Sequence, residues 1–285
     1  MKSKRLVVLL DDNKRFGNFR YVLSLLIASW EQQGWRILFC DDFGMLPEAE
    51  LALLHVNRTV IPESIVDNCL ARYQIVINHG ALDISKRVVS RQLLLPDSQD
   101  GGPVIVKTDA NCGGRRERYE HEVFGPLLKI KDRLLPWTMA ARLAGGCYPI
   151  YRNVAEVPED VWKNPALVVE RLCCERVGEL FALRQWVFFG NEEMHRISYS
   201  PEALLKSHNI IRSEMLSEVP PFLRQRREEL GFDYGKFDYV MFEGEAILLD
   251  ANRTPTYGMN IGPEVRDIAG RLAWGISFFH AQASN

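Results

Sequence analysis

Residues 231–256 read GFDYGKFDYVMFEGEAILLDANRTPT, the most informative segment of the chain. Two strand-like apolar runs, 237–242 and 246–249, flank a tight turn at Glu243 and Gly244. Short turns of this kind join antiparallel strands into hairpins. The stretch therefore predicts a β-hairpin near the end of the chain.

Three oxygen-bearing side chains lie on this predicted hairpin. Antiparallel pairing places Asp238, near the start of the first strand, close to Asp250, at the end of the second. Asn252 follows Asp250 by two residues, so in extended chain it points to the same side. Carboxylate and amide oxygens suit Mg²⁺, which proteins usually hold with one or two carboxylates plus substrate phosphates. An isolated D-x-N is more simply explained as a turn or helix cap, so the assignment needs a second element.

That second element is GGPVIVKTDANCGG at residues 101–114. A short strand, 104–106, leads into Lys107, and the loop that follows ends in Gly113 and Gly114. Glycines let backbone N–H groups approach phosphate oxygens, and a lysine supplies a positive charge. The loop is not a Walker A motif, and no G-x-G-x-x-G supports a dinucleotide site.

Length and composition are those of a globular protein of about two domains. The chain has 285 residues, of which 47% are hydrophobic and 25% charged. With 35 basic and 37 acidic residues the net charge is −2, so no bulk field favours nucleic acid or an anionic membrane.

The chain shows neither a signal peptide core nor an apolar helix of the roughly 20 residues that span a bilayer. Six cysteines occur without any C-x-x-C pair, so neither a zinc site nor a disulfide framework is indicated. Cys112 lies in the glycine-rich loop, and a redox role for it stays open. We expect a cytoplasmic protein that binds neither nucleic acid nor membrane.

The hydrophobic pattern divides the chain into an α/β part and an α+β part. The first part alternates strands and helices, which predicts a parallel sheet: strands at 5–10, 36–40, 51–56 and 74–77, helices at 19–33 and 63–73. A helix at 86–95 ends before a polar, Gly-rich stretch. The second part reads as strands at 104–106, 166–170, 182–189, 239–242 and 246–249, with helices at 115–129, 220–230 and 264–280.

The elements follow one another in an order that resembles the ATP-grasp superfamily, which includes D-alanine–D-alanine ligase, glutathione synthetase and the ribosomal-protein glutamate ligases. A lysine-bearing strand with a glycine-rich loop is followed by a strand ending in Glu, ALVVERL, then an arginine within FALRQWVFFG, and last the acidic hairpin. The resemblance extends from about residue 78 to the last helix. It implies a pre-ATP-grasp domain at 1–96 and an ATP-grasp domain at 97–285, divided into a nucleotide-clamping lobe at 97–169 and a metal-bearing lobe at 170–285.

For the phosphates of ATP, the resemblance implies two lysines and a loop. Lys107 corresponds to the phosphate-contacting lysine, under the loop that ends in Gly113 and Gly114. Lys86 falls where the family's first phosphate-binding lysine begins the preceding helix, and Arg91 competes for that role.

For the nucleoside, the resemblance implies a hinge and an acid. Glu170, with the backbone of Arg171 and Leu172, falls at the hinge that contacts adenine. Glu179 is the first candidate to hold the ribose hydroxyls, and Glu175 is the second.

For the metal, the resemblance implies that Asp238, Asp250 and Asn252 bind two Mg²⁺ ions that bridge the ATP phosphates, with Mn²⁺ as a substitute. The family usually has Glu where this chain has Asp250. The shorter side chain keeps the ligand and shifts the metal.

For catalysis, the resemblance implies three cations, Lys107, Arg184 and Lys236, around the transferred phosphoryl group. Arg184 matches an arginine of the glutamate-ligase branch that faces this group. Lys236 stands where some family ligases carry an arginine that faces the reaction centre.

The implied activity is an ATP-dependent ligase that activates a carboxylate as an acyl phosphate and couples it to an amine or a thiol. Its partners would be small-molecule or peptide substrates and a second copy of the chain in a homodimer. Arg253, Thr254 and Tyr257 follow the metal ligands in a loop where family members bind the acceptor. A small-molecule kinase of the same fold and a nucleotide-binding regulator without turnover stay open as alternatives.

Overall fold

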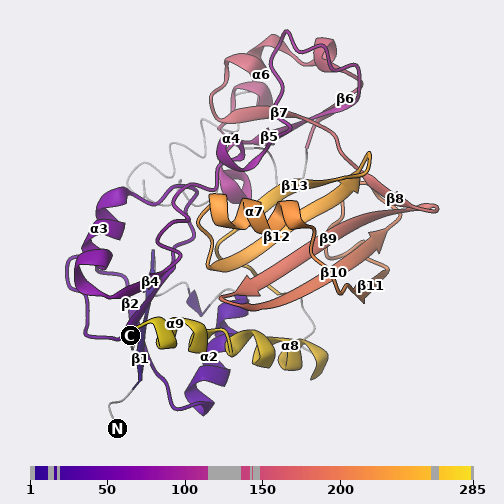
Figure 1. Cartoon of the computed structure of the whole chain (residues 1–285). Helices are drawn as coiled ribbons and strands as arrows, with labels where there is room; N and C mark the ends of the chain where they lie inside the picture. The colour runs from indigo at the N-terminus through magenta and orange to yellow at the C-terminus, as the bar shows by residue number, and fades with distance from the viewer. Residues whose placement is uncertain are drawn as a thin grey trace.

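Three β-sheets follow one another along the chain in the computed structural model, which describes residues 4–11, 16–17, 20–114, 136–141, 143, 148–257 and 263–283. Within these residues the sheets have four, three and six strands. Figure 1 shows the three-stranded sheet above the six-stranded sheet, with the N-terminal sheet beside and below them. The expected combination of a parallel sheet followed by an α+β region is confirmed.

The N-terminal sheet is parallel throughout and has the order β2-β1-β3-β4. Its elements are β1 (Arg5–Leu10), α2 (Val22–Gln32), β2 (Arg36–Cys40), β3 (Leu51–His55), α3 (Glu63–Arg72) and β4 (Ile75–Ile77). The central strands β1 and β3 are buried on both faces, as their unbroken apolar runs predict for strands of a parallel sheet.

The small sheet is antiparallel and has the order β6-β5-β7. It consists of β5 (Val104–Thr108), β6 (Ile150–Tyr151) and β7 (Leu167–Arg171), with the helix α6 (Glu159–Lys163) and short 3₁₀ turns at Asn111–Gly114, Trp137–Met139 and Val154–Glu156. The helix expected at 115–129 lies outside the described residues.

The expected helix at 86–95 is wrong beyond its first turn. Helix α4 covers only Lys86–Val89, and the chain then runs extended beside β7. Leu94 donates its backbone N–H to Val169, and Arg171 donates to Gln92, both over 2.9 Å. These hydrogen bonds to the edge of β7 replace those that further helical turns would have made, so tertiary pairing overrides local propensity.

The large sheet has the order β11-β10-β9-β12-β13, with β8 also paired to β9. Its elements are β8 (Glu175–Val177), β9 (Leu180–Phe189), β10 (Glu192–Ser200), β11 (Arg212–Met215), α7 (Pro221–Glu229), β12 (Tyr234–Phe242) and β13 (Glu245–Asn252). The predicted hairpin is confirmed, because β12 and β13 pair antiparallel and Phe242 lies opposite Glu245. Glu243 and Gly244 both have positive φ, 52° and 86°, as a two-residue turn of type I′ requires.

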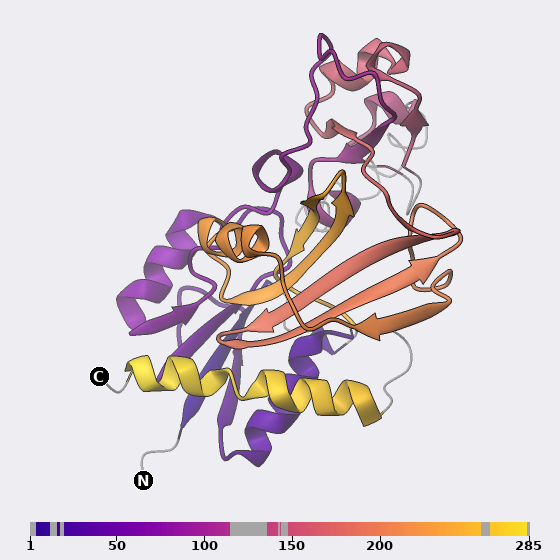
Figure 2. The same cartoon turned by 45° about the vertical axis from the view of Figure 1, so that its right-hand side comes forward.

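The two faces of the large sheet have different neighbours. On one face Trp186, Phe188, Phe237 and Tyr239 share a core with α7. On the other face Val187, Phe189 and Tyr234 pack against α2, the N-terminal sheet and the C-terminal helices. Figure 2 shows those C-terminal helices running under the large sheet. The remainder of this second face points toward the small sheet.

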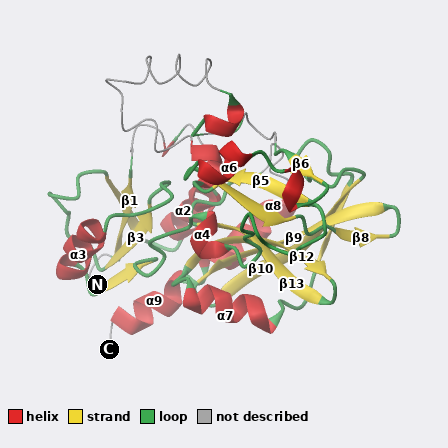
Figure 3. Ribbon diagram, turned by 90° about the horizontal axis from the view of Figure 1, so that it is seen from above, coloured by secondary structure: helices red, strands yellow, loops and turns green. Residues whose placement is uncertain are grey.

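The helix expected at 264–280 is two helices, α8 (Pro263–Ala273) and α9 (Ile276–Ala283). Gly275 lies at the break and packs on β9, where a Cβ atom would be 2.0 Å from the carbonyl oxygen of Phe189. The close contact with the sheet therefore needs glycine at this position. Figure 3 shows the helices of the chain from above. None of those in the described part of the chain has the length and apolarity needed to cross a membrane.

Candidate active site

A cavity of about 470 Å³ lies between the small and large sheets. Most of the residues predicted from the sequence line it: Lys86, Lys107, Gly113, Arg171, Leu172, Asp238, Asp250 and Asn252. They come from α4, the small sheet, the turn after β5 and the β12–β13 hairpin, so segments distant in sequence converge on one space.

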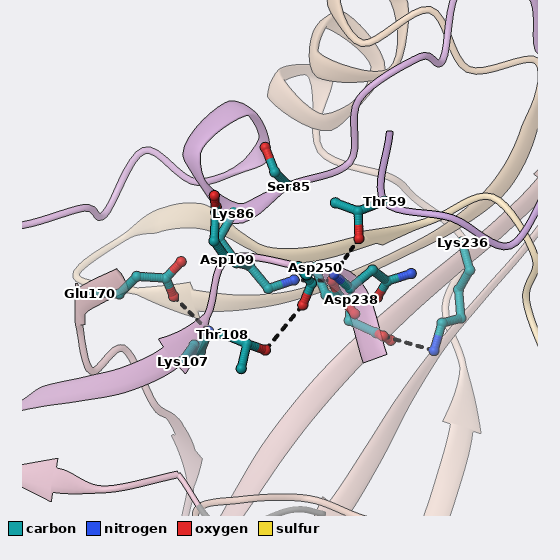
Figure 4. A network of polar contacts seen from close by, with 12 residues as sticks. Thr59, Ser85, Lys86, Lys107, Thr108, Asp109, Glu170, Lys236, Asp238 and Asp250 are labelled. Atoms are coloured by element: carbon teal, nitrogen blue, oxygen red, sulfur yellow. Dashed lines mark hydrogen bonds and ion pairs between the residues drawn. The ribbon is translucent and has the colours of Figure 1, made fainter. Parts of the chain in front are cut away.

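The hairpin register brings the candidate metal ligands together. Asp238 lies directly opposite Asp250, and Asn252 follows on the same side of β13. Asp238 accepts a hydrogen bond from Gln185 over 2.8 Å and pairs with Lys236 over 2.7 Å, as Figure 4 shows for the lysine. The Oδ1 atom of Asn252 accepts the backbone N–H of Thr254 over 2.9 Å. Each ligand is thus oriented by a neighbour.

Lys86 reaches the same acids from the first residue of α4. Its Nζ atom forms an ion pair with Asp250 (Figure 4), and its side chain is only 9% exposed. Burial alone would lower the pKa of Lys86, but the Asp250 carboxylate outweighs burial and raises it. Arg91, the alternative to Lys86, does not line this cavity; it pairs with Glu229 over 3.0 Å.

The pKa of Asp250 shows the same balance from the other side. Burial would raise it, but the positive charges of Lys86, Lys236 and Lys107 hold it below its usual range. The acid is therefore ionised at neutral pH, as a metal ligand must be.

Lys107 lies in β5, and its Nζ atom pairs with Glu170 of the neighbouring strand β7 over 2.6 Å (Figure 4). Glu170 is 2% exposed, and its second carboxylate oxygen is buried without a hydrogen-bond partner among the described residues. Such an unsatisfied acceptor costs about 1–3 kcal/mol. A ligand that donates an N–H here would remove this cost.

The loop after β5 is a 3₁₀ turn at Asn111–Gly114, so both predicted glycines lie in it. Gly113 has φ +69°, in the left-handed region that glycine adopts without strain. Thr59, from the loop after β3, accepts the backbone N–H of Asn111 over 2.9 Å. The side chain of Cys112 lies outside the described part of the structure.

In the segment expected to contact adenine, the backbone N–H groups of Arg171 and Leu172 already have acceptors within the protein. Arg171 donates its N–H to Gln92 over 2.9 Å, and Leu172 donates to Pro103 over 2.8 Å. These two N–H groups are therefore not available to a base, whereas the carbonyl oxygens of the same segment could contact one. The neighbouring Cys173 thiol is protonated at neutral pH, because burial raises its pKa to about 11.

Neither glutamate expected at the ribose is placed to hold it. Glu179 is exposed in the turn between β8 and β9 and does not line the cavity. Glu175 borders the cavity, but its carboxylate is already engaged. It accepts a bifurcated hydrogen bond from the Arg184 Nε, a second bond from the Arg184 Nη2 and a third from the Met241 backbone N–H, over 2.7–3.0 Å. The ribose assignment therefore has no support from the geometry.

Arg184 lies on the opposite face of the large sheet from the candidate metal ligands. It is the register partner of Tyr239 on β12, whereas Asp238 pairs with Gln185, one residue further along β9. Successive residues of a strand point to opposite faces, so a shift of one position moves Arg184 away from the site.

Arg196 lies on the same face of the large sheet as Asp238, although it does not line the cavity, and no prediction from the sequence named it. It lies opposite Gln185 on β10, and its Nε donates to the Gln185 side chain over 2.7 Å. Gln185 in turn donates to Asp238. No motif marks Arg196; only the strand register could have found it.

Arg253, which follows the candidate metal ligands, is not accessible to a substrate. This side chain is fully buried, and its guanidinium donates to four backbone carbonyls of the N-terminal region: Arg58, Thr59, Ala81 and Leu82. Thr254 is also buried, whereas Tyr257 is half-buried. Arg253 therefore has a structural role, and the expectation that it contacts an acceptor is wrong.

The donor set fits Mg²⁺ and a nucleotide. Two facing carboxylates and an amide oxygen are hard ligands, and no cluster of three or more His, Cys, Asp and Glu side chains competes with them in the described residues. Glu170, with its unsatisfied oxygen, lies next to Arg171 of the cavity lining but does not line the cavity itself.

No family model matches the sequence, and no curated protein matches it. Among solved structures, the ATP-grasp ligase PsnB in complex with a minimal precursor, Mg and ADP matches with a TM-score of 0.52 and 14% identity, over 99% of this chain and 98% of that chain. A RimK domain ATP-grasp protein from Sphaerobacter thermophilus matches with a TM-score of 0.50 and 14% identity, over 96% and 99%. At this identity the likeness shows the architecture, and it spans nearly the full length of both chains. The chain therefore has the ATP-grasp fold.

Proposed function

We propose that the protein is an ATP-dependent ligase that activates a carboxylate as an acyl phosphate and joins it to an amine or thiol. The observation that carries the proposal is the convergence of Asp238, Asp250 and Asn252 with Lys86 and Lys107 on one cavity. The similar protein PsnB is described as a ligase with bound Mg and ADP, which supports the same cofactors here.

The proposed roles follow from where each group lies. Asp238, Asp250 and Asn252 hold Mg²⁺, which supplies positive charge to the phosphates when bound. Lys86, Lys107 and the backbone of Gly113 and Gly114 contact the phosphates. Glu170 and the hinge at Arg171 and Leu172 contact the base. We divide the chain as expected from the sequence, near residue 96, with the small lobe up to residue 169.

The cations around the transferred phosphoryl group are Lys236, as expected from the sequence, and Arg196 in place of Arg184. Both lie on the strand face that carries Asp238. As a carboxylate oxygen of the substrate attacks the γ-phosphorus and ADP leaves, these cations stabilise the negative charge. The amine nitrogen then attacks the acyl carbon, and inorganic phosphate leaves. Holding both reactants in the cavity supplies much of the rate.

The test uses purified protein with ATP, Mg²⁺ and panels of carboxylic acids and amines. A ligase releases ADP and phosphate only when both substrates are present, and hydroxylamine traps the acyl phosphate as a hydroxamate. ADP without free phosphate would show a kinase, and the absence of any ADP across the panels, with ATP still bound, would support a regulator without turnover.

A further inference from the structure

Arg253 connects the metal-binding strand to both phosphate-binding elements through the N-terminal region. It directly follows Asn252, the last candidate metal ligand, and its side chain is fully buried. One arm of its guanidinium donates to the carbonyls of Arg58 and Thr59, the latter over 3.1 Å. The other arm donates to Ala81 and to Leu82, the latter over 2.8 Å.

The first arm acts on the phosphate loop. The Oγ1 atom of Thr59, whose own carbonyl accepts from Arg253, accepts the N–H of Asn111 at the start of the 3₁₀ turn. Thr59 is 5% exposed, so this hydrogen bond is sheltered from water. Figure 4 shows Thr59 beside the network of lysines and acids.

The second arm acts on Lys86. Asp83 and Ser85 follow Leu82 by one and three residues, and the Asp83 carboxylate accepts the N–H of Ser85 over 2.7 Å at the start of α4. Lys86 follows and donates its own N–H to Asp109 over 2.9 Å. Bridging hydrogen bonds join the two arms, since Ile84 donates to Thr59 over 3.0 Å.

We propose that Arg253 and Thr59 are positioning residues that set the phosphate loop and Lys86 at a fixed distance from the metal ligands. The inference rests on the proposed ATP site and adds to it. Lysine in place of Arg253 could not reach four carbonyls, because its ammonium lacks the planar fork of donors. The N-terminal region would thus take part in nucleotide binding without touching the nucleotide.

Thr59 offers the sharper test, because valine has the same shape and lacks the acceptor. In Thr59→Val the N–H of Asn111 loses a buried acceptor. The loop must then either shift to find another acceptor or keep an unsatisfied donor, and both outcomes disfavour phosphate binding. We expect the dissociation constant of MgATP to rise roughly tenfold. Adenosine, which carries no phosphate, should bind with an unchanged constant. Thr59→Ser, which restores the hydroxyl, should recover MgATP binding.

The control is Thr138→Val, a change of the same kind at a buried threonine outside this network. Calorimetric titration with MgATP, competition with adenosine and a thermal melt are measured for all four proteins. Equal weakening of MgATP and adenosine, or MgATP binding like that of the wild type in Thr59→Val, would overturn the positioning role. If the wild type itself does not bind MgATP, the proposed function fails first, and the inference fails with it.

Discussion

Replacing Asp250 with asparagine separates the metal site from the packing around it. The substitution keeps the size of the side chain and removes its charge, so Lys86, with 9% of its side chain exposed, loses its ion-pair partner. Breaking a buried pair from one side costs about 3–5 kcal/mol. Because the Asp250 side chain is 32% exposed, we expect the lower end, about 3 kcal/mol.

At about 2–4 °C per kcal/mol for a chain of this size, the melting temperature should fall by about 6–12 °C. The double variant Lys86→Met, Asp250→Asn removes both charges and should recover most of this loss. It should not recover Mg²⁺-dependent ATP binding, because the ligand is still missing. A thermal melt by circular dichroism and calorimetric titration of ATP with and without Mg²⁺ measure the two effects.

The control is Glu159→Gln, because Glu159 pairs with Lys163 over 2.6 Å at the surface, where the two side chains are 80% and 67% exposed. Such exposed pairs contribute little to stability, so the melting temperature of this variant should change little. If Asp250→Asn keeps the magnesium dependence of ATP binding, Asp250 is no metal ligand. If its stability matches that of the wild type, the buried ion pair does not exist as described.

Three further results are expected. Arg196→Met should lower ATP-dependent turnover by about 100-fold or more with a near-normal melt. Arg184→Met should chiefly destabilise the fold, because Glu175 loses its ion-pair partner; the opposite pattern would restore Arg184 to the site. Glu179→Ala should change the apparent affinity for ATP by less than about twofold, because Glu179 is exposed in a turn away from the cavity. A larger loss of affinity would place the β8–β9 turn at the nucleotide. Burial lowers the pKa of His55 to about 3 in the folded protein. As the pH falls below about 6.5, His55 is therefore protonated in the unfolded chain but stays neutral in the folded one. Unfolding free energy should therefore fall by about 1.4 kcal/mol per pH unit in that range through His55 alone, and urea titrations at pH 7 and 5.5 should show a shallower fall in His55→Phe.

Local chemistry decided the parts of the fold that the sequence could predict. The type I′ turn at Glu243 and Gly244 sets the pairing of β12 with β13 as far as Tyr239, which lies opposite Leu248. A β-bulge then shifts the register by one residue, and this shift brings Asp250 rather than Leu249 opposite Asp238. The continuous apolar run of β1 likewise needs burial on both faces, which a parallel sheet provides. In both cases the local structure follows from residues that are close together in the sequence, either through a turn or through a continuous run of apolar side chains.

The residues that complete the site were decided by contacts between distant segments. Arg184 and Arg196 are equally plausible in a list of arginines, and only the pairing of β9 with β10 and β12 shows that Arg196 shares a face with Asp238. The end of α4 at Val89 depends on an edge of β7 that the local sequence does not reveal. Arg253 follows the candidate metal ligand Asn252, yet its side chain is buried and donates to four backbone carbonyls of the N-terminal region.

The sequence by itself thus determined the β12–β13 hairpin, its acids and the lysine of β5, because turn geometry and strand period act over short distances. Tertiary structure alone decided which cations meet those acids and which side chains are committed elsewhere. The reason is that a strand presents its residues alternately to two faces, and the choice of face depends on partners far away in the chain.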